Sequence, residues 1–303
     1  MILVTGGTGV MGSVLVRRLA EAGERVRVLT LPGDPFVERI AATGAQLFVG
    51  DLGTTQGVAG VCTGVTRVYH LAAVILADNE NDYRRINVEG TRQLVEEAQR
   101  ENVRHFVLVS SASVVYPCTT AYSRSKRDAE ALVRNAGLPF TIVRPTLVYD
   151  RGRGGVEYDL FLSYLNRFWI VPFIGNGRAR KRPVFVDDVI DGLVALNGKR
   201  DCSGEVLHLS GGETVTMLEF ARLSLELMGS GKKPIVFVPV PLCRLLAWVL
   251  KRVVRHPPLT QQMITGVTQD ADLDPAESGR RIGYSPRGVR EMLVNCFPRE
   301  CAP

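Results

Sequence analysis

The sequence predicts an α/β fold built on a doubly wound parallel sheet, and three observations lead to this prediction. Short β-branched strand patterns alternate with longer amphipathic helix patterns through the first two thirds of the chain. A glycine-rich turn stands directly after the first strand pattern. The 303 residues, 46% of them hydrophobic and 22% charged, are enough for one large α/β domain or for a main domain with a smaller appendage.

The strand and helix patterns follow one another in the order that a parallel sheet with crossover helices requires. The predicted strands are Ile2–Val4, Val26–Leu29, Gln46–Val49, Arg67–Leu71, His105–Val109 and Phe140–Val143. The predicted helices are Gly12–Ala22, Val88–Glu101, Ser123–Asn135, Thr216–Leu227 and Pro241–Val254. After about Val148, glycine-marked turns replace the regular alternation. We therefore expect residues 1–150 to form mainly the sheet domain and residues 151–303 mainly a second region, with elements that return to the sheet.

Composition and charge narrow the classes of function. The formal net charge of +6 is mild for this length and no nucleic-acid-binding motif occurs, so we expect no nucleic-acid partner. The six cysteines form no CxxC pair and no histidine stands at ligand spacing, which predicts neither a disulfide framework nor a metal site. No apolar run reaches the roughly 18 residues of a membrane span, and no secretory signal precedes the first strand. We expect a cytoplasmic protein.

The glycine-rich turn, TGGTGVMG at positions 5–12, joins the first strand to the first helix. Gly6 permits a tight turn, Gly9 lets backbone N–H groups approach a pyrophosphate, and Gly12 permits close packing of helix and strand. The helix N-terminus adds a favourable dipole for an anion. The alternative is a glycine turn without a ligand, but its place between strand and helix favours a dinucleotide site. That site would comprise Gly6, Thr8, Gly9, Val10, Met11 and Gly12.

Two further strand ends bear on the dinucleotide. Asp51, followed by Leu52, stands just past the third strand, where its carboxylate can accept a hydrogen bond from an adenine amino group or cap a helix. The second strand ends near Thr30 and Leu31. An acidic residue there would bind the ribose 2′-OH of NAD, and an arginine would favour the 2′-phosphate of NADP. Neither is present, so NAD and NADP both stay open, with a slight preference for NADP.

Tyr122 and Lys126 are four residues apart in a helix pattern and therefore share one face. A phenol has a pKa near about 10, and a nearby ammonium lowers it toward the working pH of an acid–base catalyst. The lysine can also hold a ribose hydroxyl. Serines at 110–113 follow the strand His105–Val109, where a hydroxyl can hold a substrate oxygen. A tyrosine and a lysine four residues apart are common on helices. The prediction therefore depends on the order of the motifs along the chain, in which the glycine turn and the serines precede this pair.

A series of motifs runs from Met1 to about Val189: TGGTGVMG (5–12), DL (51–52), HLAA (70–73), NVEGT (87–91), SSAS (110–113), YSRSK (122–126), RPTLVY (144–149) and VDDV (186–189). This series resembles the extended short-chain dehydrogenases/reductases, which have a Rossmann sheet. The resemblance implies Ser111, Tyr122 and Lys126 as the catalytic triad. It adds Asn87 as a fourth residue that steadies the lysine through water, and it implies a homodimer. It also implies that the cofactor contacts Leu71, Ala72, Ala73, Tyr122, Lys126, Pro145 and Val148, with His70 in the cleft wall.

The chain departs from the family pattern in places. Ser111 and Tyr122 are only eleven positions apart, which suggests a trimmed loop at Tyr116–Ala121 and keeps Ser113 as an alternative catalytic or substrate-binding serine. Asp150 stands where the family has a glycine. Ala112 stands beside Ser111, where the nucleotide-sugar dehydratases carry an acidic residue, which argues against dehydration.

The substrate side leaves alternatives open. Arg178 and Arg182 belong to a basic cluster that either binds a diphosphate or carboxylate or forms a solvated hairpin. The segment 241–255 mixes apolar and basic residues. It predicts either an ordinary core helix, or a helix that lies on a membrane surface or caps an apolar pocket. The C-terminal part resembles the 3β-hydroxysteroid dehydrogenase branch, which implies a lipophilic small-molecule substrate.

Three functions follow from these observations. The first is an NAD(P)-dependent oxidoreductase that interconverts a hydroxyl and a ketone by Tyr/Lys/Ser chemistry. The second is a nucleotide-sugar epimerase with a retained NAD, favoured by the basic cluster. The third is a non-catalytic cofactor-binding subunit, against which the intact Tyr122–Lys126 pair argues.

Overall fold

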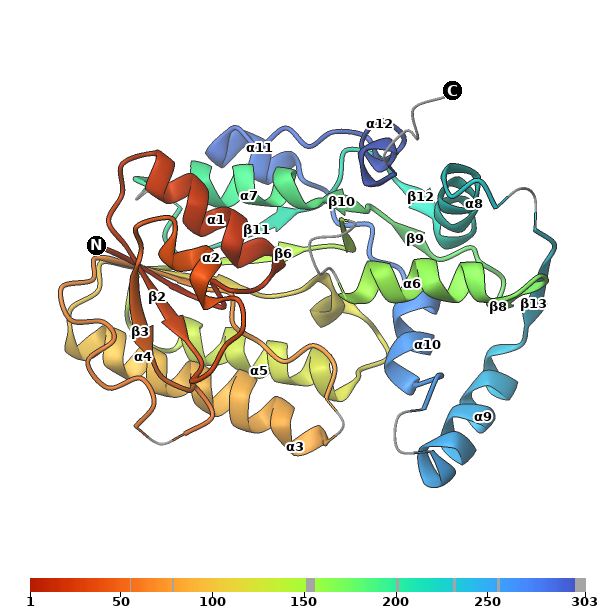
Figure 1. The fold of residues 1–303 in the computed structure, drawn as a ribbon, viewed down its shortest axis with the longest axis horizontal. Helices are drawn as coiled ribbons and strands as arrows, with labels where there is room; N and C mark the ends of the chain where they lie inside the picture. Colours follow the sequence, from red (N-terminus) through yellow and green to blue (C-terminus); the bar gives the residue numbers. More distant parts are fainter. Residues whose placement is uncertain are drawn as a thin grey trace.

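The computed structural model describes residues 1–54, 56–77, 79–150, 156–199, 202–230, 233–254 and 257–297. A seven-stranded sheet in the order β11-β6-β5-β4-β1-β2-β3 forms its centre, and all neighbouring strands in it are parallel (Figure 1). The predicted doubly wound parallel sheet is confirmed. Its strands are β1 (Ile2–Thr5), β2 (Val26–Thr30), β3 (Gln46–Val49), β4 (Arg67–His70), β5 (His105–Val109), β6 (Phe140–Pro145) and β11 (Glu205–Leu209).

The strand order reverses at β1, which lies between β2 and β4. Ligands of doubly wound sheets bind at such a switch point, beyond the carboxyl ends of the strands. The six predicted strands are all present, within two residues of their predicted bounds. The sequence patterns do not predict β11, which follows residue 150 and pairs with β6 from Glu205 opposite Thr141 to Leu209 opposite Pro145.

Helices cover both faces of the sheet (Figure 1). One face carries α1 (Val10–Glu21), α7 (Val186–Ala195) and α11 (Ala276–Ile282), and the other carries α4 (Gly90–Arg100) and α5 (Ala121–Arg134). Leu15, Leu19 and Leu193 are fully buried on the first face, and Leu94 and Val133 on the second. Because both faces are covered, the strands consist of nearly continuous apolar runs, which is why their pattern is visible in the sequence.

The helix predicted at Val88–Glu101 begins earlier and is irregular. A short α3 (Glu80–Asp82) leads into a π-helix, η1 (Tyr83–Glu89), and then into α4. A π-helical stretch changes the register of a helix, so a search for a period of 3.6 residues does not detect it, and such stretches are frequent at functional sites. Here η1 places the buried residues Tyr83 and Asn87 against α5.

The C-terminal region packs around a cluster of aromatic rings. The ring centroids of Tyr149, Tyr158 and Phe220 lie 5.7–5.9 Å apart. Thr216 and Glu219 form a capping box that starts α8, because each side chain accepts a hydrogen bond from the other's backbone N–H. The other elements are α2 (Val37–Ala41), η2 (Ala112–Val115), β7 (Val148–Tyr149), α6 (Val156–Arg167), β8 (Val171–Ile174), β9 (Arg180–Lys181), β10 (Val184–Phe185), β12 (Val215–Thr216), α8 (Met217–Leu227), β13 (Ile235–Val238), α9 (Val240–Val253), α10 (Gln261–Thr268), α12 (Val289–Leu293) and η3 (Val294–Cys296).

The helix predicted at Pro241–Val254 is present as α9, but it is not a core helix. Only Cys243 and Ala247 are buried, against Ile264 of α10. Leu245 and Trp248 are 58% and 54% exposed. The interpretation of this segment as an ordinary core helix is therefore wrong. None of the helices in the described ranges is both long and apolar enough to cross a membrane.

Candidate active site

The glycine turn leaves the N-terminus of α1 open to an anion. Gly9 is the N-cap residue, no side chain caps the helix, and its first turn has no acidic residue. A Cβ atom built on Gly9 would meet only the Gly6 carbonyl oxygen, at 3.3 Å. Unpaired N–H groups and the helix dipole attract a phosphate at such an end. The turn therefore fits a dinucleotide pyrophosphate, with Thr8, Val10 and Met11 half-buried around it.

Two glycines of the turn are required by close packing within the protein. Gly6 has φ of +69°, and a Cβ atom there would lie 2.7 Å from the Ala72 backbone nitrogen. A Cβ atom on Gly12 would lie 2.0 Å from the Gly6 carbonyl oxygen. Gly12 thus packs against the turn itself. The sequence reasoning missed Gly7, where a Cβ atom would lie 2.4 Å from Cγ1 of Val28 on β2.

The strand ends that bear on the adenine side are adjacent in the sheet. Thr30 ends β2 and is buried, with its hydroxyl directed at the Phe48 carbonyl, while Leu31 is 53% exposed. The Asp51 carboxylate accepts a hydrogen bond from the Gly53 backbone N–H at 2.7 Å, and no helix follows it, so it is not a helix cap. Leu52 is buried. The adenine role of Asp51 and Leu52 stays a prediction.

The segment after β4 forms a wall beside the glycine turn. The backbone N–H groups of Leu71 and Ala72 donate to the carbonyl and hydroxyl oxygens of Thr5, and the segment 71–73 is half-buried. His70 does not line this wall, contrary to expectation. It is 2% exposed, and its ring nitrogens lie 2.7 Å from the Thr5 hydroxyl and 2.9 Å from the Thr91 hydroxyl. Burial lowers the pKa of His70 to about 3, so the ring is neutral and connects Thr5 to Thr91 inside the protein.

The predicted catalytic side chains converge at the carboxyl end of β5. Ser111 follows β5 and caps η2, and Tyr122 lies in the first turn of α5, whose start Thr120 caps. Ser111 lies close enough to Tyr122 for its hydroxyl to lower the pKa of the phenol. The hydroxyl oxygens of Ser111 and Ser113 lie 3.0 Å apart, and Ser111 Oγ also accepts from the Ser113 N–H. This geometry favours Ser111 as the serine next to the tyrosine, with Ser113 supporting it.

The protonation states of Tyr122 and Lys126 follow from burial. Burial raises the pKa of Tyr122 above its ordinary value, the Glu157 carboxylate raises it further, and the Ser111 hydroxyl lowers it. Burial lowers the pKa of Lys126 from 10.5 to about 8, and Glu130 acts in the opposite direction. Lys126 Nζ donates to the Val109 carbonyl at 2.8 Å. The pKa of Tyr122 is thus raised and not lowered, contrary to the effect expected of a neighbouring ammonium, and the phenol holds its proton at neutral pH.

Asn87 makes three hydrogen bonds that fix its side chain. It accepts from the Val74 backbone N–H at 2.8 Å and donates to the Val74 carbonyl and to the Ser125 hydroxyl, both at 3.0 Å. It thus joins the segment after β4 to the catalytic helix α5. Its expected action on Lys126 through water stays a prediction.

Glu130, one helical turn beyond Lys126, is a residue that the sequence reasoning missed. It is 5% exposed, accepts from the Ser110 hydroxyl at 2.6 Å, and forms a two-pronged ion pair with Arg144, at 2.9 and 2.6 Å. These bonds tie α5 to the ends of β5 and β6. The only signal in the sequence was the spacing of one turn from the lysine.

The basic cluster at 178–182 is divided in the structure. Arg182 and Arg180 both pair with Asp272, at 2.7 Å, and Arg178 is exposed. Because a paired guanidinium has less charge to offer a substrate, the geometry weakens the substrate role predicted for Arg182. Lys181 instead is 2% exposed, and its Nζ donates to the Tyr116 hydroxyl at 2.8 Å.

Lys181 and three side chains near it lie on the Tyr122 side of the site, and we name the four the substrate-side cluster: Tyr83, Tyr116, Glu157 and Lys181. The Tyr83 ring lies 6.1 Å from the Tyr122 ring. The Glu157 side chain still reaches solvent, and its charge acts on the other three members and on Tyr122. Burial lowers the pKa of Lys181 to about 8. A buried lysine that burial makes easy to deprotonate points to function.

Pro145 and Val148 lie at the same edge of the sheet as Ser111. Pro145 is buried and ends β6, which is the parallel neighbour of β5, and Val148 is half-buried and begins β7. Their expected contact with the nicotinamide side is compatible with this place. Arg151, Arg153 and His256 lie outside the described residues.

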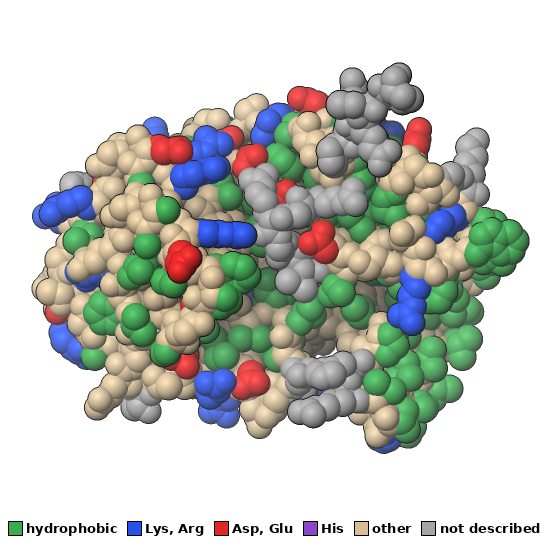
Figure 2. Space-filling view, in the orientation of Figure 1, with side chains coloured by type: hydrophobic (Ala, Val, Ile, Leu, Met, Phe, Trp, Pro, Cys, Tyr) green, Lys and Arg blue, Asp and Glu red, His purple; other side chains and the backbone are tan. Residues whose placement is uncertain are grey.

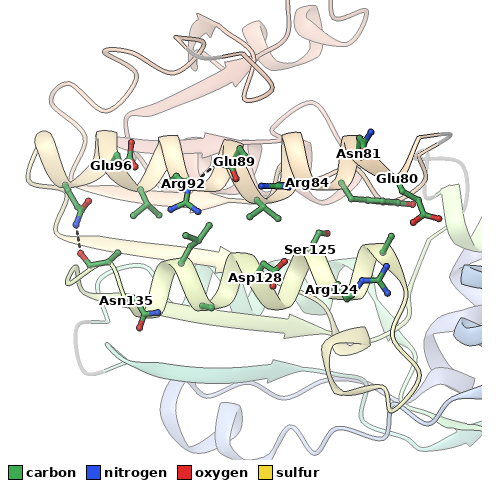
Figure 3. A pocket seen from close by; sticks show the side chains of 18 residues that line it. Glu80, Asn81, Arg84, Glu89, Arg92, Glu96, Arg124, Ser125, Asp128 and Asn135 are labelled. Atoms are coloured by element: carbon green, nitrogen blue, oxygen red, sulfur yellow. Dashed lines mark hydrogen bonds and ion pairs between the residues drawn. The ribbon is translucent and has the colours of Figure 1, made fainter.

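A separate groove of about 860 Å³ runs between α4 and α5 (Figure 3). Charged side chains from η1, α4 and α5 border it: Glu89, Arg92, Glu96, Arg124 and Asp128. Tyr122 and Lys126 do not line it. The groove thus opens on the other side of Tyr83 and Ser125, which line it and also contact Tyr122 and Asn87.

Comparison with known proteins gives consistent matches. The sequence pattern of the NAD dependent epimerase/dehydratase family matches residues 2–208. A ceramide reductase of Caulobacter vibrioides is 32% identical over 248 residues, which cover 80% of this chain and 74% of that protein. A 3-beta-hydroxysteroid dehydrogenase of Mycolicibacterium neoaurum is 27% identical over 335 residues, covering 98% and 90%. A dTDP-glucose 4,6-dehydratase structure of Streptomyces venezuelae, with NAD bound, has the same fold: its TM-score is 0.76 at 23% identity, covering 98% and 95%.

Proposed function

This chain belongs to the NAD-dependent epimerase/dehydratase family, and on that premise we propose that it reduces a ketone on a lipophilic small molecule to the alcohol. It is an extended short-chain dehydrogenase/reductase enzyme, as its motifs predicted. The observation that carries the proposal is the meeting of Ser111, at the carboxyl end of β5, with Tyr122 and Lys126 of α5, whose ammonium group is anchored on the Val109 carbonyl of the same strand.

The chain's own residues supply binding and proton transfer. The Tyr122 hydroxyl donates its proton to the substrate oxygen, which the Ser111 hydroxyl holds by a hydrogen bond. The Tyr122 phenol is protonated at neutral pH, as donation to a ketone oxygen requires. The glycine turn would hold the pyrophosphate of a dinucleotide, whose nicotinamide would supply the hydride. Lys126 holds a ribose hydroxyl and keeps positive charge beside the tyrosine.

The substrate class is supported by the names of relatives and by the lining. The two relatives above are named for action on a ceramide and on a 3β-hydroxysteroid, both of them lipophilic. In this chain, Ala112 next to Ser111 offers no acid for dehydration. Ile75 and Leu76 are apolar and 39% and 44% exposed. They lie next to Tyr83, because the Ile75 carbonyl accepts a hydrogen bond from the Tyr83 hydroxyl. An apolar substrate fits these surroundings.

The test is Tyr122→Phe, which removes the donated proton and keeps the ring. We expect turnover of lipophilic ketones to fall by about a hundredfold to ten-thousandfold, with dinucleotide binding retained. Binding is followed by the quenching of protein fluorescence on titration with the dinucleotide. Ketone reduction by the Phe variant at the unaltered rate would disprove the assignment.

A nucleotide-sugar epimerase is the second candidate, because the family includes epimerases. The pairing of Arg180 and Arg182 with Asp272 speaks against it, since those charges are already neutralised. Denaturing the purified protein and identifying any released nucleotide separates the two. Near-equimolar NAD would indicate a retained cofactor and an epimerase, whereas little nucleotide would indicate an exchanging cosubstrate. A non-catalytic role has no support, because the catalytic pair is intact.

For the dinucleotide, we propose NADP over NAD. The end of β2 carries Thr30 and the exposed Leu31, so no carboxylate there repels a 2′-phosphate.

We further propose that the chain forms a homodimer through the α4–α5 groove. The groove is bordered by acidic and basic side chains together, so the same surface of a second copy, turned by a two-fold axis, can match it in charge. Sedimentation of the protein with Arg92→Glu would then show a shift toward the monomer.

A further inference from the structure

Helix α9 carries most of its apolar side chains on the outside of the protein. Leu245, Trp248 and Val253 are 58%, 54% and 72% exposed, whereas only Cys243 and Ala247 are buried. Isolated exposed leucines are ordinary, but a contiguous exposed apolar patch marks an interaction surface.

The apolar surface continues from α9 onto the neighbouring strands. β13 leads into α9 and pairs in parallel with β8, from Ile235 opposite Val171, so Trp169 and Ile170 lie beside the start of β13, at its end away from α9. Figure 2 shows hydrophobic side chains along this edge of the molecule. We name the set the α9 surface: Trp169, Ile170, Val236, Phe237, Leu242, Leu245, Leu246, Trp248, Val249 and Val253.

The stretch of sequence that contains α9 carries only positively charged side chains. No Asp or Glu occurs between Glu226 and Asp270. The same stretch of sequence contains six basic residues: Lys232, Lys233, Arg244, Lys251, Arg252 and Arg255. Of those that the structure describes, Lys233 donates to the Asn166 carbonyl, and Arg244, Lys251 and Arg252 belong to α9 itself. The Arg252 guanidinium lies 3.4 Å from the centre of the Trp248 ring, so charge and aromatic surface are presented together. Lys251 has one acidic neighbour from elsewhere, Glu80 of α3, in an exposed pair.

These charges decide between two occupants. In a two-fold contact with a second copy, the α9 surface would meet itself and bring lysines and arginines against lysines and arginines. A bilayer with anionic headgroups offers both an apolar layer for leucine and tryptophan and negative charge for the basic residues. Charge complementarity therefore favours the anionic bilayer.

The α9 surface is also close to the chemistry. Gln261 of α10 donates to the Arg244 carbonyl of α9 at 3.1 Å. Its neighbour Gln262 accepts from the Tyr83 hydroxyl at 3.0 Å, and the Tyr83 ring lies 6.1 Å from Tyr122. Few residues thus separate the outward apolar face from the catalytic tyrosine.

We propose that the α9 surface docks on an anionic lipid bilayer and that this docking gives the active site access to a ketone dissolved in the bilayer. The substrate in this inference rests on the proposed function. The docking rests only on the exposure and the charge of the α9 surface. Docking of this kind is peripheral, with α9 parallel to the membrane plane.

The docking test is co-sedimentation with vesicles of phosphatidylcholine and of phosphatidylcholine mixed with phosphatidylglycerol. We expect the protein to bind the mixed vesicles at least about tenfold more strongly, and the preference to weaken as salt is added. Leu245→Ser/Trp248→Ser should abolish binding to both, and Lys251→Gln/Arg252→Gln should remove the preference. Leu47→Thr, an exposed leucine on the edge strand β3, is the matched control and should bind as the unaltered protein does.

A second readout separates docking from catalysis. On a water-soluble ketone without vesicles, the Leu245→Ser/Trp248→Ser variant should retain the unaltered rate, but on a ketone carried in mixed vesicles it should lose about tenfold or more. Equal binding of all variants, or no binding by the unaltered protein, overturns the proposal. A change from dimer to monomer in the serine variant, without vesicle binding by the unaltered protein, overturns it in favour of a second copy. Absence of turnover on every ketone would overturn the proposed function instead.

Discussion

Lys126 donates its ammonium hydrogen bond to the backbone carbonyl of Val109, at 2.8 Å, and this bond joins the catalytic helix α5 to the last residue of β5. Ser111 stands two residues further along the chain. The lysine therefore has a structural anchor at the place where the serine begins, and its protonation state affects both geometry and charge.

The pKa of Lys126 predicts a pH limit of activity. Burial lowers it to about 8, so the side chain is charged below that pH and loses its charge above it. We expect kcat/KM to fall as the pH rises through about 8, because a neutral lysine holds the ribose and the Val109 carbonyl less well. In Lys126→Arg, whose guanidinium stays charged, any residual activity should lack that limb. A full pH profile of both proteins is the measurement, and an unchanged limb in the arginine variant would assign it to another group.

Glu130 is predicted to position the serine loop. In Glu130→Gln, the Arg144 charge remains while its partner is lost, so we expect about 3 kcal/mol less stability and a kcat at least about tenfold lower. Glu97 offers a matched control, because it is 2% exposed and paired with Arg100, yet lies on α4 away from Ser110. Glu97→Gln should lower the melting temperature with kcat unchanged. Equal kcat values in both variants would remove the positioning role of Glu130.

Burial of the charged Lys181 side chain should lower the free energy of unfolding of the protein. Its pKa is about 8 in the folded protein and 10.5 ordinarily, so between these values the unfolded chain binds more protons, and stability rises with pH. Below pH 8 the full cost is present. We expect Lys181→Met to stabilise the protein by about 1–4 kcal/mol at pH 7 and to flatten stability between pH 8 and 10.5. Denaturant unfolding across that range is the measurement, with activity lost in parallel if the substrate-side cluster binds substrate.

The dinucleotide preference should depend on Leu31. We expect Leu31→Asp to lower kcat/KM for NADPH by about tenfold, about 1.4 kcal/mol, because its carboxylate repels the 2′-phosphate. Asparagine has nearly the same shape as aspartate without the charge, so Leu31→Asn should leave kcat/KM for both NADPH and NADH unchanged. A starting preference for NADH would contradict the NADP proposal directly.

The central strands could be predicted because their side chains are apolar on both faces, which a short window of sequence reveals. β11 could not be predicted in the same way. Its pattern is interrupted by Glu205 and His208, which are only half-buried at the edge of the sheet. The π-helix η1 was missed because its hydrogen-bond register departs from the period on which helix patterns depend.

For the candidate site, spacing along the sequence identified the residues that lie on one helix or directly after one strand. Tyr122 and Lys126 are neighbours on α5, and Ser111 follows a strand end. The contacts of Lys181 with Tyr116 and of Glu130 with Arg144 join residues that are far apart in the chain and meet only through tertiary packing. Exposure is equally invisible in the sequence, since a helix such as α9 has the same apolar content whether it faces the core or solvent.

The π-helix η1 gives one continuous helix two orientations. Each residue turns an α-helix by about 100°, so the extra residue of a π turn rotates everything before it relative to everything after it. Tyr83 and Asn87 face the catalytic helix from η1, while Arg92 and Glu96 of α4 border the outer groove. Deleting one residue of η1 would therefore turn Tyr83 relative to Arg92, and because Tyr83 and Glu89 of η1 also border the outer groove, one end of that groove would turn with it. The wall beside Tyr122 and the outer groove are thus linked through the register of a single helix.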